Sequence, residues 1–152
     1  MKTVKKYLFG FIMMILLVSC GFNNLSHIED INGEENTTLN TLTNDDLLSN
    51  TPHALFNMSV KNSVNNKTKF SCDKFSGVSD LVEYTITKET TFKVNAKILK
   101  GNGDIFVYQK QKRVQDINFP YDGNVTINNV TGKISFRIAG ESAKLEITIE
   151  KI

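Results

Sequence analysis

Alternation of apolar and polar residues runs through residues 53–152 and constrains the fold more than any other feature of the sequence. The clearest run has apolar side chains at every second position, at Phe92, Val94, Ala96 and Ile98. Successive side chains of a strand point to opposite faces, so a period of two predicts strands with one buried face. No helical period occurs in this region, and an all-β domain is therefore expected.

Residues that favour turns divide this region into short segments. We expect strands near 56–60, 70–72, 82–86, 92–98, 105–109, 114–119, 125–127, 134–138 and 145–149, with breaks at 65–66, 76–77, 101–104, 120–123, 128–129 and 140–142. The 101–104 segment, Gly-Asn-Gly-Asp, is a strong hairpin signal because Asn and Gly tolerate positive φ. Eight or nine short strands predict a small antiparallel β-sandwich, with a partly closed barrel as the alternative.

The N-terminus has the organisation of a secretory signal. Lys2, Lys5 and Lys6 precede a run of 12 residues, 7–18, that is apolar apart from Gly10 and the Tyr7 hydroxyl. A membrane-spanning helix needs about 20 apolar residues, so this run is too short for a stable anchor. A basic start followed by an apolar run of this length indicates an export signal.

The end of this leader, Leu17-Val18-Ser19-Cys20 followed by Gly21, resembles the lipobox of bacterial lipoproteins. The resemblance implies that the Cys20 thiol receives a diacylglycerol, that cleavage precedes Cys20, and that the new amine can be acylated. Two or three acyl chains hold a protein firmly on a membrane. Residues 1–19 are thus expected to be a signal peptide, and the mature protein to sit on the cell membrane or outer membrane, facing away from the cytoplasm.

Residues 20–52 are expected to be an acidic, disordered tether. Between 21 and 52 there are six acidic residues and no Lys or Arg, and apolar residues are sparse. Such a segment buries too little apolar surface to offset its ordering entropy. Its alternative role is a recognition segment that folds on a partner. Pro52 marks the expected boundary, because the residue before proline is disfavoured in helix.

The second cysteine, Cys72, is expected to be a buried and inert thiol. If Cys20 carries lipid, Cys72 has no partner within the chain. It shares a strand face with Phe70, as a small core residue would. A nucleophilic thiol would need a neighbouring histidine, and neither His27 nor His53 is close in sequence.

The sequence contains no motif for catalysis, for a metal ion or for a cofactor. Asn102 and Asp104 offer too few oxygens for calcium, which needs six to eight. Asp116 and Asp122, flanking Tyr121, could hold a sugar but also suit an ordinary polar loop. No phosphate-binding loop, nucleophile elbow or zinc motif is present. We therefore expect a protein that is not an enzyme and has no cofactor.

Five basic residues form a candidate binding patch: Lys93, Lys97, Lys110, Lys112 and Arg113. If 101–104 is a hairpin turn, the two strands it joins would bring these cations together. A positive patch on an envelope protein suits acidic wall polymers, lipid headgroups or an acidic protein. The alternative is a solvated face or lysines that guard a strand edge. The charge balance does not suggest a nucleic-acid partner.

Three functions remain open from the sequence. The first is a membrane-anchored binding module for an envelope polymer or another envelope protein. The second is a small hydrolase, or an inhibitor of one, on the same sandwich. The third is an accessory subunit of an envelope complex, which would need an apolar patch or an open strand edge.

Overall fold

The computed structural model describes residues 39–152, which form one antiparallel six-stranded sheet with one short helix. The elements are α2 (Asn44–Leu48), β1 (Ala54–Val64), β2 (Lys67–Ile86), β3 (Thr90–Gln109), β4 (Lys112–Ile117), β5 (Tyr121–Ile127) and β6 (Gly132–Lys151). The strand order is β1-β2-β6-β3-β4, and β5 pairs with β3 as well. The expected signal peptide, 1–19, and residues 20–38 of the expected tether, with Cys20 among them, lie outside the described residues.

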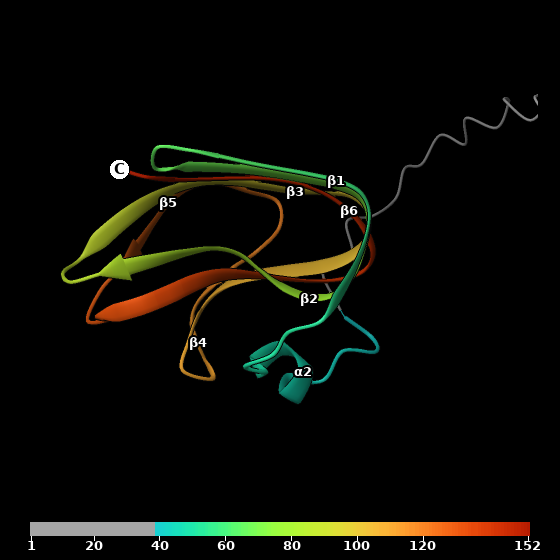
Figure 1. Cartoon of the computed structure of the whole chain (residues 1–152), viewed down its shortest axis with the longest axis horizontal. Helices are drawn as coiled ribbons and strands as arrows, with labels where there is room; N and C mark the ends of the chain where they lie inside the picture. The colour runs from blue at the N-terminus through green and yellow to red at the C-terminus, as the bar shows by residue number, and fades with distance from the viewer. Residues whose placement is uncertain (1–38) are drawn as a thin grey trace, which may run out of the picture. The chain divides into compact units, whose positions relative to one another are not determined.

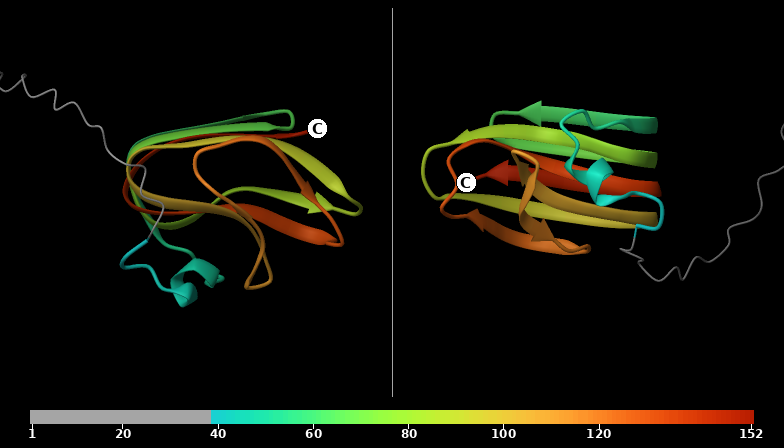
Figure 2. Two further views of the ribbon diagram at one scale, coloured as in Figure 1. Left: turned by 180° about the vertical axis from the view of Figure 1, so that it is seen from behind. Right: turned by 90° about the horizontal axis from the view of Figure 1, so that it is seen from below.

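The sheet folds over on itself to make a sandwich that is not closed into a barrel (Figure 1). Three 20-residue strands, β2, β3 and β6, each bend and run through both layers. The first half of β3 pairs with β5, and its second half pairs with β4. The upper layer in Figure 1 thus contains β1, β5 and one half of each long strand, and the lower layer contains β4 and the other halves (Figure 2). The prediction of an antiparallel β-sandwich is confirmed.

The core lies between the two layers and is built by the alternating apolar residues. Phe92 and Phe136 are fully buried, with ring centroids 5.0 Å apart and nearly perpendicular planes. Tyr84 extends this cluster, 4.9 Å from Phe92. Fully burying a side chain such as Phe92 contributes about 1.5–3 kcal/mol, so the alternation that predicts the strands also supplies the main stabilising term.

Three of the predicted turns are wrong, because the chain bends there without leaving the strand. β2 continues through 76–77, β3 through 101–104 and β6 through 140–142. Pairing of β3 with β6 shifts register near 98–102, and pairing of β2 with β6 shifts between Cys72 and Gly77. Bulges and glycines let a strand change direction while it keeps its partners. The sequence signals therefore mark bends at these places. Because β2, β3 and β6 each contain two of the expected segments, the nine segments form six strands. The turn predicted at 120–123 lies earlier, at 118–120, because β5 begins at Tyr121.

Residues 39–52, called the strap here, cover the outer face of the lower layer (Figures 1 and 2). Leu47 is buried in a second apolar cluster with Val78, Phe106, Tyr108 and Ala139; Leu39, Leu42 and Leu48 pack against it. A capping box at Thr43 and Asp46 starts α2. The predicted tether is thus wrong for residues 39–52. The sparse leucines find an apolar face of the sheet, which a count of apolar residues does not reveal.

Candidate functional site

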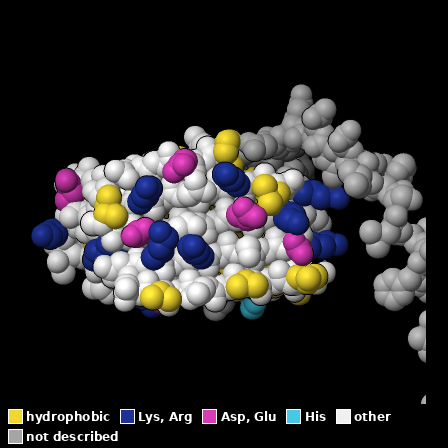
Figure 3. Space-filling view, turned by 90° about the horizontal axis from the view of Figure 1, so that it is seen from above, with side chains coloured by type: hydrophobic (Ala, Val, Ile, Leu, Met, Phe, Trp, Pro, Cys, Tyr) yellow, Lys and Arg dark blue, Asp and Glu magenta, His cyan; other side chains and the backbone are white. Residues whose placement is uncertain are grey.

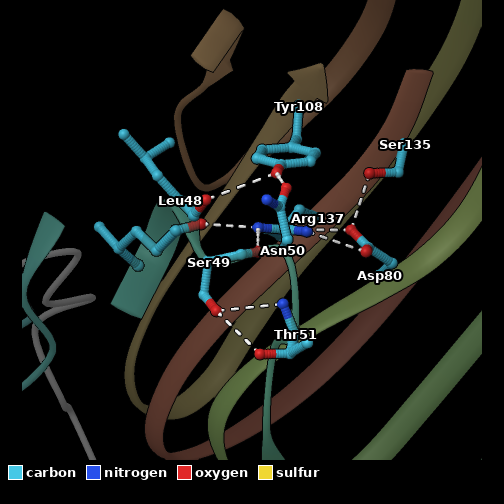
Figure 4. A network of polar contacts seen from close by, with 9 residues as sticks. Leu48, Ser49, Asn50, Thr51, Asp80, Tyr108, Ser135 and Arg137 are labelled. Atoms are coloured by element: carbon cyan, nitrogen blue, oxygen red, sulfur yellow. Dashed lines mark hydrogen bonds and ion pairs between the residues drawn. The ribbon is translucent and has the colours of Figure 1, made fainter. Parts of the chain in front are cut away.

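Arg137 on β6 is the largest fully buried polar side chain among the described residues, and it lies beneath the strap. Its Nε donates to Asp80 Oδ1 at 2.8 Å, and its Nη2 donates to Asp80 Oδ2 at 2.9 Å (Figure 4). Ser135 Oγ also donates to Asp80 Oδ1, at 2.7 Å. This two-pronged pairing matches the planar guanidinium to the carboxylate and keeps the buried charge compensated.

The same guanidinium also holds the main chain of the strap. Arg137 Nη1 donates to the carbonyl oxygens of Leu47 at 2.9 Å and Ser49 at 2.8 Å. The Tyr108 ring lies against the guanidinium, 3.5 Å from Cζ to the ring centroid, and its hydroxyl donates to Asn50 Oδ1 (Figure 4). A cation over an aromatic face is attracted by the ring quadrupole. We call Arg137, Asp80, Tyr108 and Ser135 the clamp.

Glu141 holds the beginning of the strap from the bend of β6. Its carboxylate accepts hydrogen bonds from the backbone N–H groups of Asn40, Thr41 and Leu42, at 2.5 to 3.2 Å, and from the Thr41 hydroxyl at 2.7 Å. The hydrogen bonds from the Asn40 and Thr41 backbones lower the pKa of Glu141 to about 2. Hydrogen bonds to the charged form favour that form. Glu141 is therefore an anion cradled by backbone amides.

Strand β1 forms an open edge of the upper layer, since it pairs with β2 alone. Most large apolar side chains exposed in the described chain belong to it. They are Leu55, Phe56, Met58, Val60 and Val64, with exposures of 78%, 46%, 76%, 65% and 59%. Exposed edges leave backbone N–H and C=O groups free to pair with another strand.

The alternation of β1 is interrupted at Met58. Phe56 packs on the core side against Phe75, with ring centroids 5.2 Å apart. Met58 has a left-handed backbone with φ 50°, and β2 loses register with β6 at the same level. Beyond this point Val60 lies opposite the exposed Ser71, so it turns away from the core. β1 thus places apolar groups on both faces of the edge, and Lys61 is its one charged residue.

The outer face of the upper layer is polar and balanced in charge. Figure 3 shows lysines and acidic residues interleaved over this face, with apolar side chains both scattered among them and along one long edge. Lys67 pairs with Glu150 at 2.8 Å, and Lys144 pairs with Asp73 at 2.9 Å. A groove of about 450 Å³ runs beside β1, lined in part by Met58 and Val60. Met58 and Val60 thus belong both to the β1 edge and to this groove.

The structure does not assemble the predicted basic patch by hairpin pairing. Because β3 continues through 101–104, Lys93 and Lys97 lie in the upper layer, opposite Glu150 and Glu146 of β6. Lys110 lies in the turn between β3 and β4, and Lys112 begins β4, in the lower layer. Arg113 makes ion pairs with Asp104 and Asp116 and stacks on Phe106, 4.0 Å from Cζ to the ring centroid. The prediction failed because it rested on a turn that is a bend.

The other candidate residues have structural surroundings. Cys72 is buried, as predicted, with Sγ 3.2 Å from the Lys74 carbonyl oxygen. His53 is exposed at the start of β1, and its carbonyl accepts the Val78 N–H. Tyr121 donates its hydroxyl to the Asn124 carbonyl at 2.9 Å. Over residues 39–152, no three His, Cys, Asp or Glu side chains gather as metal ligands would.

Sequence reasoning missed both the clamp and the edge. Arg137 occupies a polar position of the strand expected near 134–138, and the alternation of that strand does not indicate that it is buried. The signal for its burial is that its neighbours on the same strand face, Ser135 and Ala139, are small residues. The edge could have been suspected from Leu55, Met58 and Val64, which exceed what one buried face needs.

Comparisons with known proteins gave no match of any kind. No family model matches the chain, and neither a curated protein nor a solved structure does. In the described part of the chain, no helix has both the length and the apolar character needed to cross a membrane.

Proposed function

We propose that this protein is a lipid-anchored envelope protein whose sandwich is a non-catalytic binding module, and that β1 is its binding surface. The observation that supports the proposal is the open edge with four apolar side chains more than half exposed, Leu55, Met58, Val60 and Val64. Soluble domains usually protect an edge of this length with charges or a covering segment. Lys61 is the one charge on β1.

An extended segment of another protein fits this edge best. Strand addition takes affinity from main-chain hydrogen bonds and specificity from alternate side chains. A partner strand would contact Val60 and Val64 on one face and Phe56 on the other. Its own side chains should be mainly apolar, with an acidic residue near Lys61. A polysaccharide lacks the regular backbone donors and acceptors that an edge offers to a strand, so another envelope protein is favoured over a wall polymer.

The same edge also favours the accessory-subunit function over a hydrolase or an inhibitor of one. An accessory subunit needs an open strand edge or an apolar patch, and β1 supplies both. The two interaction functions differ in the lifetime of the complex. A complex that survives solubilisation and purification in detergent indicates a subunit. A complex captured only by crosslinking indicates a transient binder.

The anchor is tested on Cys20. In cells fed an alkyne fatty acid, the wild-type protein should be labelled, and Cys20→Ala should lose the label because no other residue of the motif can form the thioether. Cys72→Ala is the matched control, and it should retain the label. Equal labelling of wild type and Cys20→Ala would disprove the anchor.

The edge is tested with a photo-crosslinking amino acid placed at Asn62 of β1 in the native envelope. Asn124 on β5, at the other edge of the same layer, is the control position. We expect a discrete crosslinked partner from Asn62 alone, and its loss in the Val60→Lys/Val64→Lys variant. Leu99→Lys, which changes an exposed apolar residue away from β1, should leave the crosslink intact. An unchanged crosslink in the double variant would rule out the edge.

A further inference from the structure

The strap is held at two places by side chains that contact its main chain. Glu141 accepts the N–H groups of Asn40, Thr41 and Leu42. Arg137 donates to the carbonyl groups of Leu47 and Ser49. Donors at the start of the strap and acceptors at its end are thus each matched by one charged side chain of β6. Charge-assisted hydrogen bonds are the stronger ones, so these two residues supply most of the polar attachment.

The strap contributes little to the core of the sandwich. No strap residue belongs to the large apolar cluster between the layers. Leu47 is its single buried side chain, at 6% exposure, and it packs in the separate cluster on the outer face of the lower layer. The five-residue helix α2 is far shorter than the 12–15 residues that an isolated helix needs. The strap therefore depends on the sandwich, while the main core does not depend on the strap.

We propose that the strap is a separable, intramolecular ligand of the sandwich, which undocks from Glu141 and the clamp while both layers stay folded. Local opening of this kind is expected where few apolar contacts hold a segment. Undocking uncovers the apolar surface of Val78, Phe106 and Tyr108. It also frees 14 residues of chain ahead of β1. Fully extended, they span roughly 45 Å, at about 3.3 Å per residue.

Together with the proposed anchor, the docked and undocked states of the strap allow the domain two different maximum distances from the membrane. With the strap docked, the chain leaves the sandwich at residue 39; with the strap undocked, it leaves at β1. The undocking itself does not depend on the anchor or on the proposed function. Its test uses exchange rates of backbone amides, so failure of the anchor or of the β1 edge would leave the test unaffected.

Native-state hydrogen exchange of the chain without its leader, residues 20–152, tests the proposal at increasing urea concentrations. We expect the amides of Thr41, Leu42 and Leu47 to exchange at least tenfold faster than those of Val94 and Ile138 in the core. Their exchange should also respond weakly to urea, since local opening exposes little surface. Strap amides that share the rate and the urea dependence of the core would overturn the proposal, because strap and sandwich would then open together.

Glu141→Gln sharpens the test, because Glu141 lies at the surface and its loss should leave the sandwich folded. The substitution weakens the charge-assisted hydrogen bonds to the strap, so strap exchange should accelerate by roughly tenfold or more while core exchange stays constant. Glu146→Gln is the matched control, on the same strand and away from the strap. Unchanged strap exchange in Glu141→Gln, or equal acceleration of strap and core, would contradict the proposal.

Discussion

Arg137 shows how one buried charge can be kept in a domain this small. Its guanidinium is 1% exposed, and its Nε, Nη1 and Nη2 all donate hydrogen bonds. Burial is the largest influence on the pKa of Asp80 and raises it, but the hydrogen bonds from Arg137 and Ser135 and the charge of Arg137 outweigh it. The pKa of Asp80 therefore falls below its usual value, and the pair stays ionised. A lysine could not replace the fork geometry that serves Asp80 and two carbonyl groups together.

Replacing Arg137 by methionine should destabilise the domain by about 3 kcal/mol, the lower end for breaking a buried pair because Asp80 keeps some solvent contact. Asp80 would lose its partner, and the carbonyl groups of Leu47 and Ser49 would lose their donor. Urea unfolding at neutral pH measures the change in the free energy of unfolding. Lys97→Met, at an exposed position of β3, should change it by less than about 0.5 kcal/mol. Equal effects of the two substitutions would show that Arg137 is not a stabilising centre.

At the scale of the element, the bends in the three long strands depend on local backbone freedom. Gly77 has φ +108°, and a Cβ placed there would lie 2.3 Å from the His53 carbonyl oxygen. Gly101 has φ +78°, with the Ser142 carbonyl oxygen at 2.6 Å from such a Cβ. Both conformations are ones that L side chains rarely adopt, and both backbones approach a neighbour closely. Glycine is needed at these places because the strand must turn without losing its partners.

Gly77→Ala should lower the free energy of unfolding by roughly 2–3 kcal/mol, because strain at positive φ adds to the clash with His53. Thermal unfolding followed by circular dichroism measures the loss. Gly123→Ala is the control, since its Cβ would meet only the Tyr121 side chain, at 3.4 Å or more. That substitution should shift stability by less than about 1 kcal/mol. A Gly77→Ala protein as stable as the control would mean that the bend tolerates a side chain.

The sequence predicted the faces of the strands better than their ends. Alternation located the buried residues, from Phe92 to Ile98 and from Leu145 to Ile149, because burial of one face dictates that pattern. It could not separate a bend from a turn at Gly101, since glycine and asparagine serve both. The predicted basic patch depended on that turn, and the structure does not form it. The strap was missed because its few leucines act through a distant apolar face, at Phe106 and Ala139, which only the folded sheet creates.

At the scale of the whole molecule, strap and sandwich should respond differently to acid. The pKa of Glu141 is lowered from 4.5 to about 2 in the folded protein. A lowered folded-state pKa contributes stability above pH 4.5 that is lost as pH falls towards 2. The pKa of Asp80 is lowered too, so the clamp weakens in the same direction.

Acid titration should therefore loosen the strap first. We expect faster amide exchange in residues 40–42 between about pH 4.5 and 2, after correction for the intrinsic exchange rate, while β-type circular dichroism persists. The Glu141→Gln protein, which already lacks this carboxylate, should show a smaller change over the same range. Loss of the β-type spectrum before any change in the strap would contradict this order.

The three long strands have a mechanical consequence. β2, β3 and β6 each bend from one layer into the other, so the two layers are joined by continuous main chain at three places. Sandwiches whose layers are joined by loops can shear one sheet over the other, but here sliding would have to stretch covalent backbone. The softest motion left to the domain is flexing about the line of bends, where Gly77 and Gly101 lie. A partner that pulls on β1 would therefore load both layers together, through β2, instead of stripping one from the other.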